Sequence, residues 1–139
     1  MCIRDSHTPA VVWREDYLEQ PNAVTGVAGV IGEVDDVDEA GEAFGSVFGD
    51  RVARRGEAVE IDHENLTVAL LSGAELRARF GLEPTGEAAL RVLQLGTRSM
   101  ETTARALDEN EVEPFRPEKG TLRVPPEDAC GALIEFVAR

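Results

Sequence analysis

The sequence contains one order of segments twice, and this repeat limits the possible folds more than any other feature. A strand-like run, a helical stretch and three further strand-like runs occupy residues 24–72, and the same order returns over residues 86–139, at an offset of roughly 60 to 66 residues. Solenoids need about three repeats to be stable. Two copies instead favour an α+β domain of two paired βαβββ modules, within one chain or swapped between two chains.

In the first module, the clearest signals belong to the helix. Apolar residues recur at helical spacing over residues 37–48, Asp36 can cap the first turn with Glu39 three residues on, and Gly49 can end the helix. The run before it spans residues 27–34. Three strand-like runs follow, over residues 51–54, 58–62 and 66–71.

The second module repeats these signals more weakly. Residues 88–95 are strand-like, and Thr97 is predicted to cap a helix that ends near Asn110. The three strand-like runs that follow are residues 114–116, 121–124 and 131–137. Between the modules, Ser72 opens a short helix that ends at Gly81.

The first 23 residues follow neither pattern. Residues 1–6 resemble translated sequencing-adapter read-through, as found on bacterial metagenome fragments, and Met1 and Cys2 are then interpreted as non-native. The alternative is a natural start with a frayed tail, and whether a segment is missing upstream stays open. Residues 7–23 are interpreted as a linker or arm. Cys130 then stands alone, and one cysteine forms no disulfide within its chain.

Charge and hydropathy exclude several classes of partner. The formal net charge is -13, which repels nucleic acid and anionic membrane surfaces. No apolar run approaches the roughly 20 residues of a membrane span, and no signal-peptide pattern is present. We therefore expect a cytoplasmic protein that binds neither nucleic acid nor membrane.

Two segments resemble a known domain. The segment PNAVTGVAGVIGEVDDVDEAGEAFGSVFG and the later LRVPPEDACGALIEFV resemble the opening and closing parts of a glyoxalase-like domain of the vicinal-oxygen-chelate (VOC) superfamily. That superfamily includes glyoxalase I, extradiol dioxygenases, methylmalonyl-CoA epimerase and antibiotic-binding resistance proteins. The resemblance covers residues 24–139 and implies a partly open, barrel-like sheet with helices outside. It also implies a homodimer or a tandem VOC domain upstream as partner.

The resemblance implies four positions for metal ligands, on the first and last strands of each module. Metal-dependent relatives carry His, Glu or Gln there, and the divalent ion polarises two substrate oxygens. The positions fall on Gly29, Ala69, Glu87 and Glu135. Because Gly29 and Ala69 have no donor side chain, the site is predicted to be degenerate, with Glu135 and Glu87 as its remnants and no cofactor bound.

Strand alternation predicts a second pair of charges in the concavity between the modules. Glu33 and Arg91 are expected to face it, whereas Leu90 and Val92 are expected to pack beneath the helices. A buried charge requires a partner. Either Arg91, with Glu33, binds the carboxylate or carbonyl of a ligand, or the two residues form a structural ion pair. His63 is interpreted as a solvated turn residue.

Three functions remain open at this point. The leading hypothesis is a metal-free glyoxalase-like domain that binds a small organic molecule or supports a catalytic VOC domain upstream. The alternative is a lyase, isomerase or dioxygenase that holds a divalent metal through Glu135 and Glu87, with Glu135 as ligand or general base. The third is a binding protein that sequesters a drug-like molecule, although the large aromatics Trp13 and Tyr17 lie outside the modules.

Overall fold

The computed structural model describes residues 20–116 and 121–139. The interpretations of residues 1–6 and of most of the 7–23 arm, including Trp13 and Tyr17, lie outside the described residues. The first half contains, in order, β1 (Val24–Glu33), α3 (Val37–Phe48), β2 (Val52–Arg55), β3 (Ala58–His63) and β4 (Leu66–Leu71). The helix α4 (Gly73–Phe80) joins it to β5 (Ala89–Thr97), α5 (Met100–Glu109), β6 (Leu122–Val124) and β7 (Leu133–Ala138). The 3-10 turns η2 (Gly49–Arg51) and η3 (Pro126–Asp128) complete the elements.

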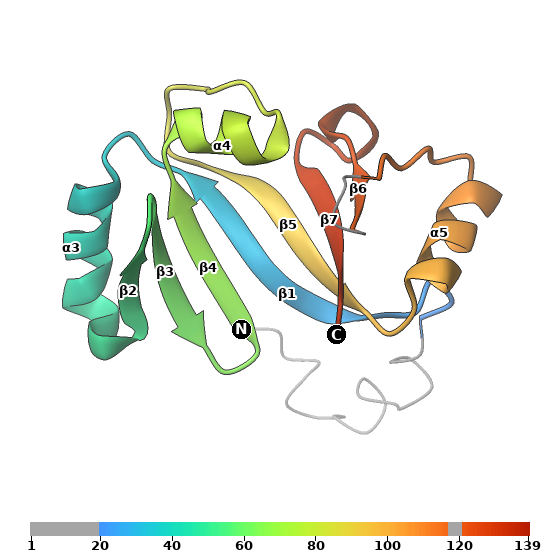
Figure 1. Ribbon diagram of the computed structural model, residues 1–139, viewed down its shortest axis with the longest axis horizontal. Helices are drawn as coiled ribbons and strands as arrows, with labels where there is room; N and C mark the ends of the chain where they lie inside the picture. Colours follow the sequence, from blue (N-terminus) through green and yellow to red (C-terminus); the bar gives the residue numbers. More distant parts are fainter. Residues whose placement is uncertain (1–19, 117–120) are drawn as a thin grey trace, which may run out of the picture.

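The repeated order is confirmed, with one strand of the second module reduced. The expected run at residues 114–116 forms only a single bridge, between Phe115 and Arg123. The described residues therefore form a seven-stranded sheet in the order β2-β3-β4-β1-β5-β7-β6. The sheet is mixed and does not close into a barrel, because β2 and β6 end it at opposite edges (Figure 1).

The helix caps follow the sequence signals with one exception. The Asp36 side chain accepts hydrogen bonds from the backbone N–H groups of Asp38 and Glu39, and Ser72 caps α4. The prediction that Thr97 caps the second-module helix is wrong, because Ser99 caps α5 and Thr97 is the last residue of β5. Thr97 is buried instead, and its hydroxyl lies 2.8 Å from that of Thr103 inside α5.

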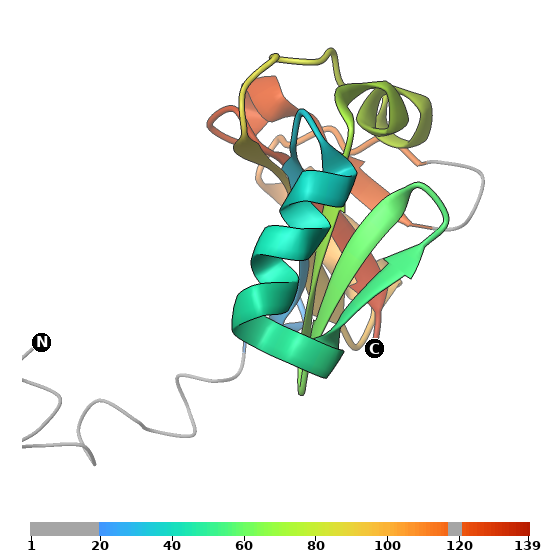
Figure 2. The same ribbon diagram turned by 90° about the vertical axis from the view of Figure 1, so that its left-hand side faces the viewer.

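Three apolar clusters divide the core between the two faces of the sheet. One lies between α3 and strands β2–β4, and another lies between α5 and strands β6 and β7. Figure 1 shows these two helices at opposite ends of the sheet, as expected for helices outside the modules, and Figure 2 shows α3 from the side that faces away from α5. The third cluster lies on the opposite face, which we call the α4 face, where Leu76 and Phe80 of α4 pack on the strands. Its strand residues are Ile31, Ala58, Ala69, Leu71, Val92 and Leu133.

A register shift in β5 determines which side chains reach the α4 face. β1 pairs Ile31 with Val92 and Gly32 with Leu90, so Arg91 is the extra residue of a bulge. Because of this shift, Val92 joins the α4-face cluster, and the prediction that it packs beneath the outer helices is wrong. Leu90 is likewise not covered by a helix, since 71% of its surface is exposed.

Candidate functional site

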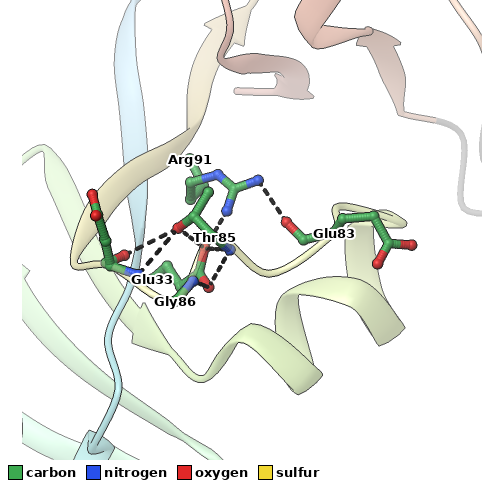
Figure 3. Close-up of polar contacts among 6 residues, drawn as sticks. Glu33, Glu83, Thr85, Gly86 and Arg91 are labelled. Atoms are coloured by element: carbon green, nitrogen blue, oxygen red, sulfur yellow. Dashed lines mark hydrogen bonds and ion pairs between the residues drawn. The ribbon is translucent and has the colours of Figure 1, made fainter.

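The carboxylate of Glu33 is the most densely hydrogen-bonded group at the end of the α4 face. Glu33 is the last residue of β1 and only 3% exposed. It accepts hydrogen bonds from the backbone N–H of Thr85 at 2.9 Å, from the Thr85 hydroxyl at 2.9 Å and from the Gly86 N–H at 3.4 Å (Figure 3). Arg91 forms an ion pair with the same carboxylate and donates a second bond to the Glu83 carbonyl at 3.0 Å. These contacts fix the segment between α4 and β5 against the end of β1.

The pKa of Glu33 reflects a balance of burial against these donors. Burial alone raises the pKa, because a charged carboxylate loses its hydration. The Thr85 hydroxyl, the N–H groups of Thr85 and Gly86, and the Arg91 guanidinium lower it by more, so the pKa lies below its usual value of 4.5. Glu33 is therefore a stable anion at neutral pH rather than a proton donor.

A second buried pair lies further along the α4 face. Glu135 of β7 is 5% exposed; its Oε1 accepts from Arg123 Nε at 2.8 Å and its Oε2 accepts from Gln94 Nε2 at 2.6 Å. Arg123 also donates to the Arg79 carbonyl at 3.1 Å, and its guanidinium carbon lies 4.7 Å from the centre of the Phe80 ring. Both oxygens of Glu135 are thus occupied by side chains of this chain.

The structure locates the equivalent positions of the two modules. Gly29 precedes the α3 cap Asp36 by seven residues (36 − 29 = 7), and Val92 precedes the α5 cap Ser99 by the same number (99 − 92 = 7). Gly29 pairs with Thr67 and Val92 pairs with Leu133, so that Ala69 and Glu135, two residues further on, also correspond. Ala69 and Glu135 are also the two positions that the resemblance places on the last strands of the modules. Val92, however, takes the place that sequence comparison gave to Glu87.

The structure does not bring Glu87 and Glu135 together. Glu87 is exposed, lies two residues before β5 and bonds to Thr85 through its backbone N–H. Glu135 pairs with Gln94, five residues beyond the first residue of β5, which corresponds to roughly 16 Å along an extended strand. Glu33 and Arg91 do meet, as predicted, and form an ion pair.

Of the four equivalent positions, one carries a side chain that could bind a metal ion, and that residue is Glu135. Gly29, Ala69 and Val92 have no donor atom, and Glu135 is already paired with Arg123. Gln94 occupies the adjacent space, since a Cβ on Gly29 would lie 2.3 Å from the Gln94 Oε1. Within residues 20–116 and 121–139, no three His, Cys, Asp or Glu side chains are grouped as metal ligands would be.

A cleft of about 370 Å³ opens beside Arg91. It lies between the C-terminal end of α4, β5 and the turn before β7. Its walls carry two aromatic rings, several apolar side chains and two acidic residues, Glu83 and Glu127; they also include Phe80, Leu82, Arg91, Phe115, Pro126 and Leu133. Apolar walls with a few polar groups are typical of small-molecule sites. The side chain of Arg91 is 13% exposed and supplies the cationic group of this cleft.

Sequence reasoning missed Gln94, Arg123, Phe80 and Phe115. A signal for Arg123 was present, because it stands between Leu122 and Val124 just as Glu135 stands in the apolar run of β7. Counting seven residues back from Ser99 would also have found Val92. His63, as expected, is an exposed residue next to the turn between β3 and β4.

No helix among the described residues has the length and apolar content to cross a bilayer.

Neither a family model nor a curated relative matches this sequence. Solved structures do match it. The methylmalonyl-CoA epimerase of Mycobacterium tuberculosis is 18% identical, with a TM-score of 0.59, over 90% of this chain and 95% of that one. A hypothetical protein from Bacillus halodurans is 16% identical, with a TM-score of 0.58, over 81% and 93%.

A third similar structure carries a ligand. A variant of the Streptomyces coelicolor methylmalonyl-CoA epimerase, in complex with 2-nitronate-propionyl-CoA, is 19% identical, with a TM-score of 0.54, over 83% of this chain and 97% of that one. At such identities the likeness concerns the fold. This chain has the fold of the vicinal-oxygen-chelate superfamily, as its two βαβββ modules predicted.

Proposed function

We propose that this chain is a metal-independent VOC-fold domain that binds a small organic molecule in the cleft beside Arg91. The observation that carries the proposal is the donor set at the four equivalent positions. Three of them, Gly29, Ala69 and Val92, offer a metal no ligand, and Glu135 is neutralised by Arg123. A bound ion acting as a Lewis acid would find one carboxylate at these four positions, Glu135, and that carboxylate already pairs with Arg123.

The chemistry of the cleft supports binding of an apolar molecule with one oxygen acceptor. Phe80, Phe115 and Leu133 provide apolar wall. Arg91 spends one Nη on Glu33 and the other on the Glu83 carbonyl, but a guanidinium has five N–H donors, so donors remain for a ligand oxygen. The Glu33 pair then orients Arg91 rather than competing with the ligand. The two interpretations of Arg91, structural pair and ligand contact, are compatible in this geometry.

The metal content of the purified protein tests the first half of this proposal. Mn, Fe, Ni, Co and Zn are each offered, excess ion is removed, and bound metal is measured by elemental analysis. We expect far less than one ion per chain, equal in the wild type and in Glu135→Ala. One ion per chain that is lost in Glu135→Ala would overturn the proposal and favour the metal-dependent lyase, isomerase or dioxygenase.

Backbone amide shifts test the second half. Small keto acids, carboxylic acids and their amides are titrated into the ¹⁵N-labelled protein. Ligands of the cleft are expected to shift Leu82, Phe115 and Leu133, and Phe115→Ala should weaken their binding by severalfold, since Phe115 is exposed and supports no core. Val47→Ala, which removes an exposed apolar side chain outside the cleft, is the matched control. Binding that Phe115→Ala leaves unchanged would place the ligand elsewhere.

A further inference from the structure

A second cavity lies on the opposite face of the sheet, under the C-terminal half of α3. Its volume is about 230 Å³. Its walls are the rings of Phe44 and Phe48 from α3 with Ile61, Leu66 and Val68 from β3 and β4, and they are apolar throughout. An apolar cavity of about 150 Å³ is known to accept benzene. This one therefore has room for one aromatic ring or a short alkyl chain, and is smaller than a drug-sized site.

The mouth of this cavity carries one cationic and one anionic side chain and an imidazole. Arg51, Asp62 and His63 border it. Asp62 is engaged already, because it lies 3.5 Å from Arg55 and accepts from the Thr67 hydroxyl at 3.3 Å. Across the part of the chain that the structure describes, neither Arg51 nor His63 has a side-chain hydrogen bond or ion pair.

Among the described residues, most arginines form an ion pair, whereas Arg51 does not, and neither do Arg98 and Arg116. In a chain of net charge -13, acidic groups are plentiful, and seven arginines form ion pairs with them: Arg54, Arg55, Arg77, Arg79, Arg91, Arg105 and Arg123. Arg51 is the last residue of η2 and lies three residues after Phe48, which lines the cavity. A cation and an imidazole N–H at the mouth of an apolar cavity complement a ligand with an apolar body and an anionic head.

We propose that this α3 cavity is a second binding site, specific for a small aryl or short alkyl carboxylate. The ring or chain of the ligand lies against Phe44, Phe48 and Val68, and its carboxylate accepts hydrogen bonds from Arg51 and His63. The stacked pair of Phe44 and Phe48, with ring centres 6.0 Å apart, supplies an aromatic wall. This site shares no residue with the cleft beside Arg91 and does not depend on the function proposed for that cleft.

The test uses 3-phenylpropionate and its neutral analogue 3-phenylpropionamide, titrated into the ¹⁵N-labelled full chain. We expect saturable amide shifts at Phe44, Phe48, Ile61 and Val68, with a Kd on the order of 1 mM for so small a ligand. The amide should bind about threefold to fivefold more weakly, because it cannot pair with Arg51. Shifts confined to Leu82 and Leu133 would assign the probe to the other cleft and overturn the proposal.

Two variants measure separately what the Arg51 charge and the apolar cavity contribute to binding. Arg51→Gln should weaken binding of 3-phenylpropionate by about threefold to fivefold, whereas Arg98→Gln, an equal loss of charge at an exposed site away from the cavity, should not. Leu66→Trp should fill the cavity and abolish the shifts, and its own spectrum reports whether it is folded. Arg51 is exposed, so Arg51→Gln keeps the test decisive if Leu66→Trp unfolds.

Two further results would overturn the proposal. One is equal binding of the acid and the amide. The other is a concentration-dependent dimer, measured by sedimentation, that Val47→Ser and Phe48→Ser abolish; it would show that the exposed end of α3 covers a second copy of this chain.

Discussion

The two buried Glu–Arg pairs of the α4 face are built from different partners. Glu33 lies at the end of β1 and is held by two backbone N–H groups and a hydroxyl in addition to Arg91. Glu135 lies inside β7 and is held by two side chains, those of Arg123 and Gln94. The first carboxylate therefore anchors a loop, whereas the second is satisfied only by side chains that a few substitutions can remove.

This difference indicates separate roles for the two pairs. The Glu33 pair closes one end of the sheet and needs close packing, since a Cβ on Gly73 would lie 2.8 Å from the Glu33 Oε1. The Glu135 pair occupies the position where the VOC fold is expected to hold a metal ligand. There the Arg123 guanidinium provides the positive charge that balances the carboxylate. The first pair therefore holds a loop against the end of β1, whereas the second neutralises a carboxylate inside the sheet.

The largest effect is expected from Glu33→Ala. Removal of this carboxylate leaves Arg91 without its counter-charge and leaves the donors of Thr85 and Gly86 without an acceptor. Breaking a buried pair in this way costs about 3–5 kcal/mol of unfolding free energy. Urea unfolding followed by circular dichroism measures this loss of unfolding free energy.

An exposed ion pair provides the control for that loss. Asp38→Ala removes a carboxylate that pairs with Arg54 but is 84% exposed, and should cost less than about 1 kcal/mol. Equal losses in Glu33→Ala and Asp38→Ala would show that the Glu33 anchor contributes nothing beyond a surface pair.

An intermediate effect, with recovery, is expected at the other pair. Arg123→Met alone leaves Glu135 buried without its cation and should cost about 3 kcal/mol. Adding Glu135→Leu should restore stability to within about 1 kcal/mol of the wild type, because apolar residues of similar size often replace a buried pair without loss. Gln94 is half-buried and keeps access to water.

The matching double variant of the first pair should not recover. In Glu33→Leu with Arg91→Met, the N–H groups of Thr85 and Gly86 still lack an acceptor. Double-mutant cycles on both pairs, from urea unfolding, measure the contrast. Recovery of stability at both pairs, or at neither, would show that the Glu33 and Glu135 pairs do not differ in their dependence on backbone donors.

The same contrast shows how far the sequence predicts this site. Apolar periodicity and the capping residues predict the order of elements, because these signals are local: Asp36, Ser72 and Gly81 act where they stand. The meeting of Glu33 and Arg91 followed from alternation and the need of buried charges for partners. The Glu33 anchor also depends on Thr85, which lies in a segment without periodicity. No sequence pattern therefore predicted the contact between Thr85 and Glu33.

Glu87 does not correspond to Gly29, because β5 begins only at Ala89 and Val92 is the residue that precedes the α5 cap by seven. Separately, a one-residue bulge at Arg91 changes which residues of β5 reach the α4 face, and a bulge has no reliable sequence signal without a glycine. The partners of Glu135 lie 12 and 41 residues away along the chain, in β6 and β5, so only the folded sheet brings them together. Strand pairing therefore determines this site, whereas local sequence determines the helices.

The smallest effect, and the finest distinction, is expected from acid. The folded-state pKa of Glu33 is lowered, so the unfolded chain binds a proton there more readily than the folded protein. The stabilisation from Glu33 is present above its usual pKa of 4.5 and is lost as pH falls through the lowered folded value. Urea unfolding midpoints measured from about pH 7 down to about pH 3 should thus fall more steeply for the wild type than for Glu33→Gln below that usual pKa.

Glu57→Gln, a change at an exposed carboxylate, should keep the wild-type slope. Parallel curves for wild type and Glu33→Gln would show that the Thr85, Gly86 and Arg91 donors do not hold the Glu33 anion, and the anchor would then be a matter of packing rather than charge.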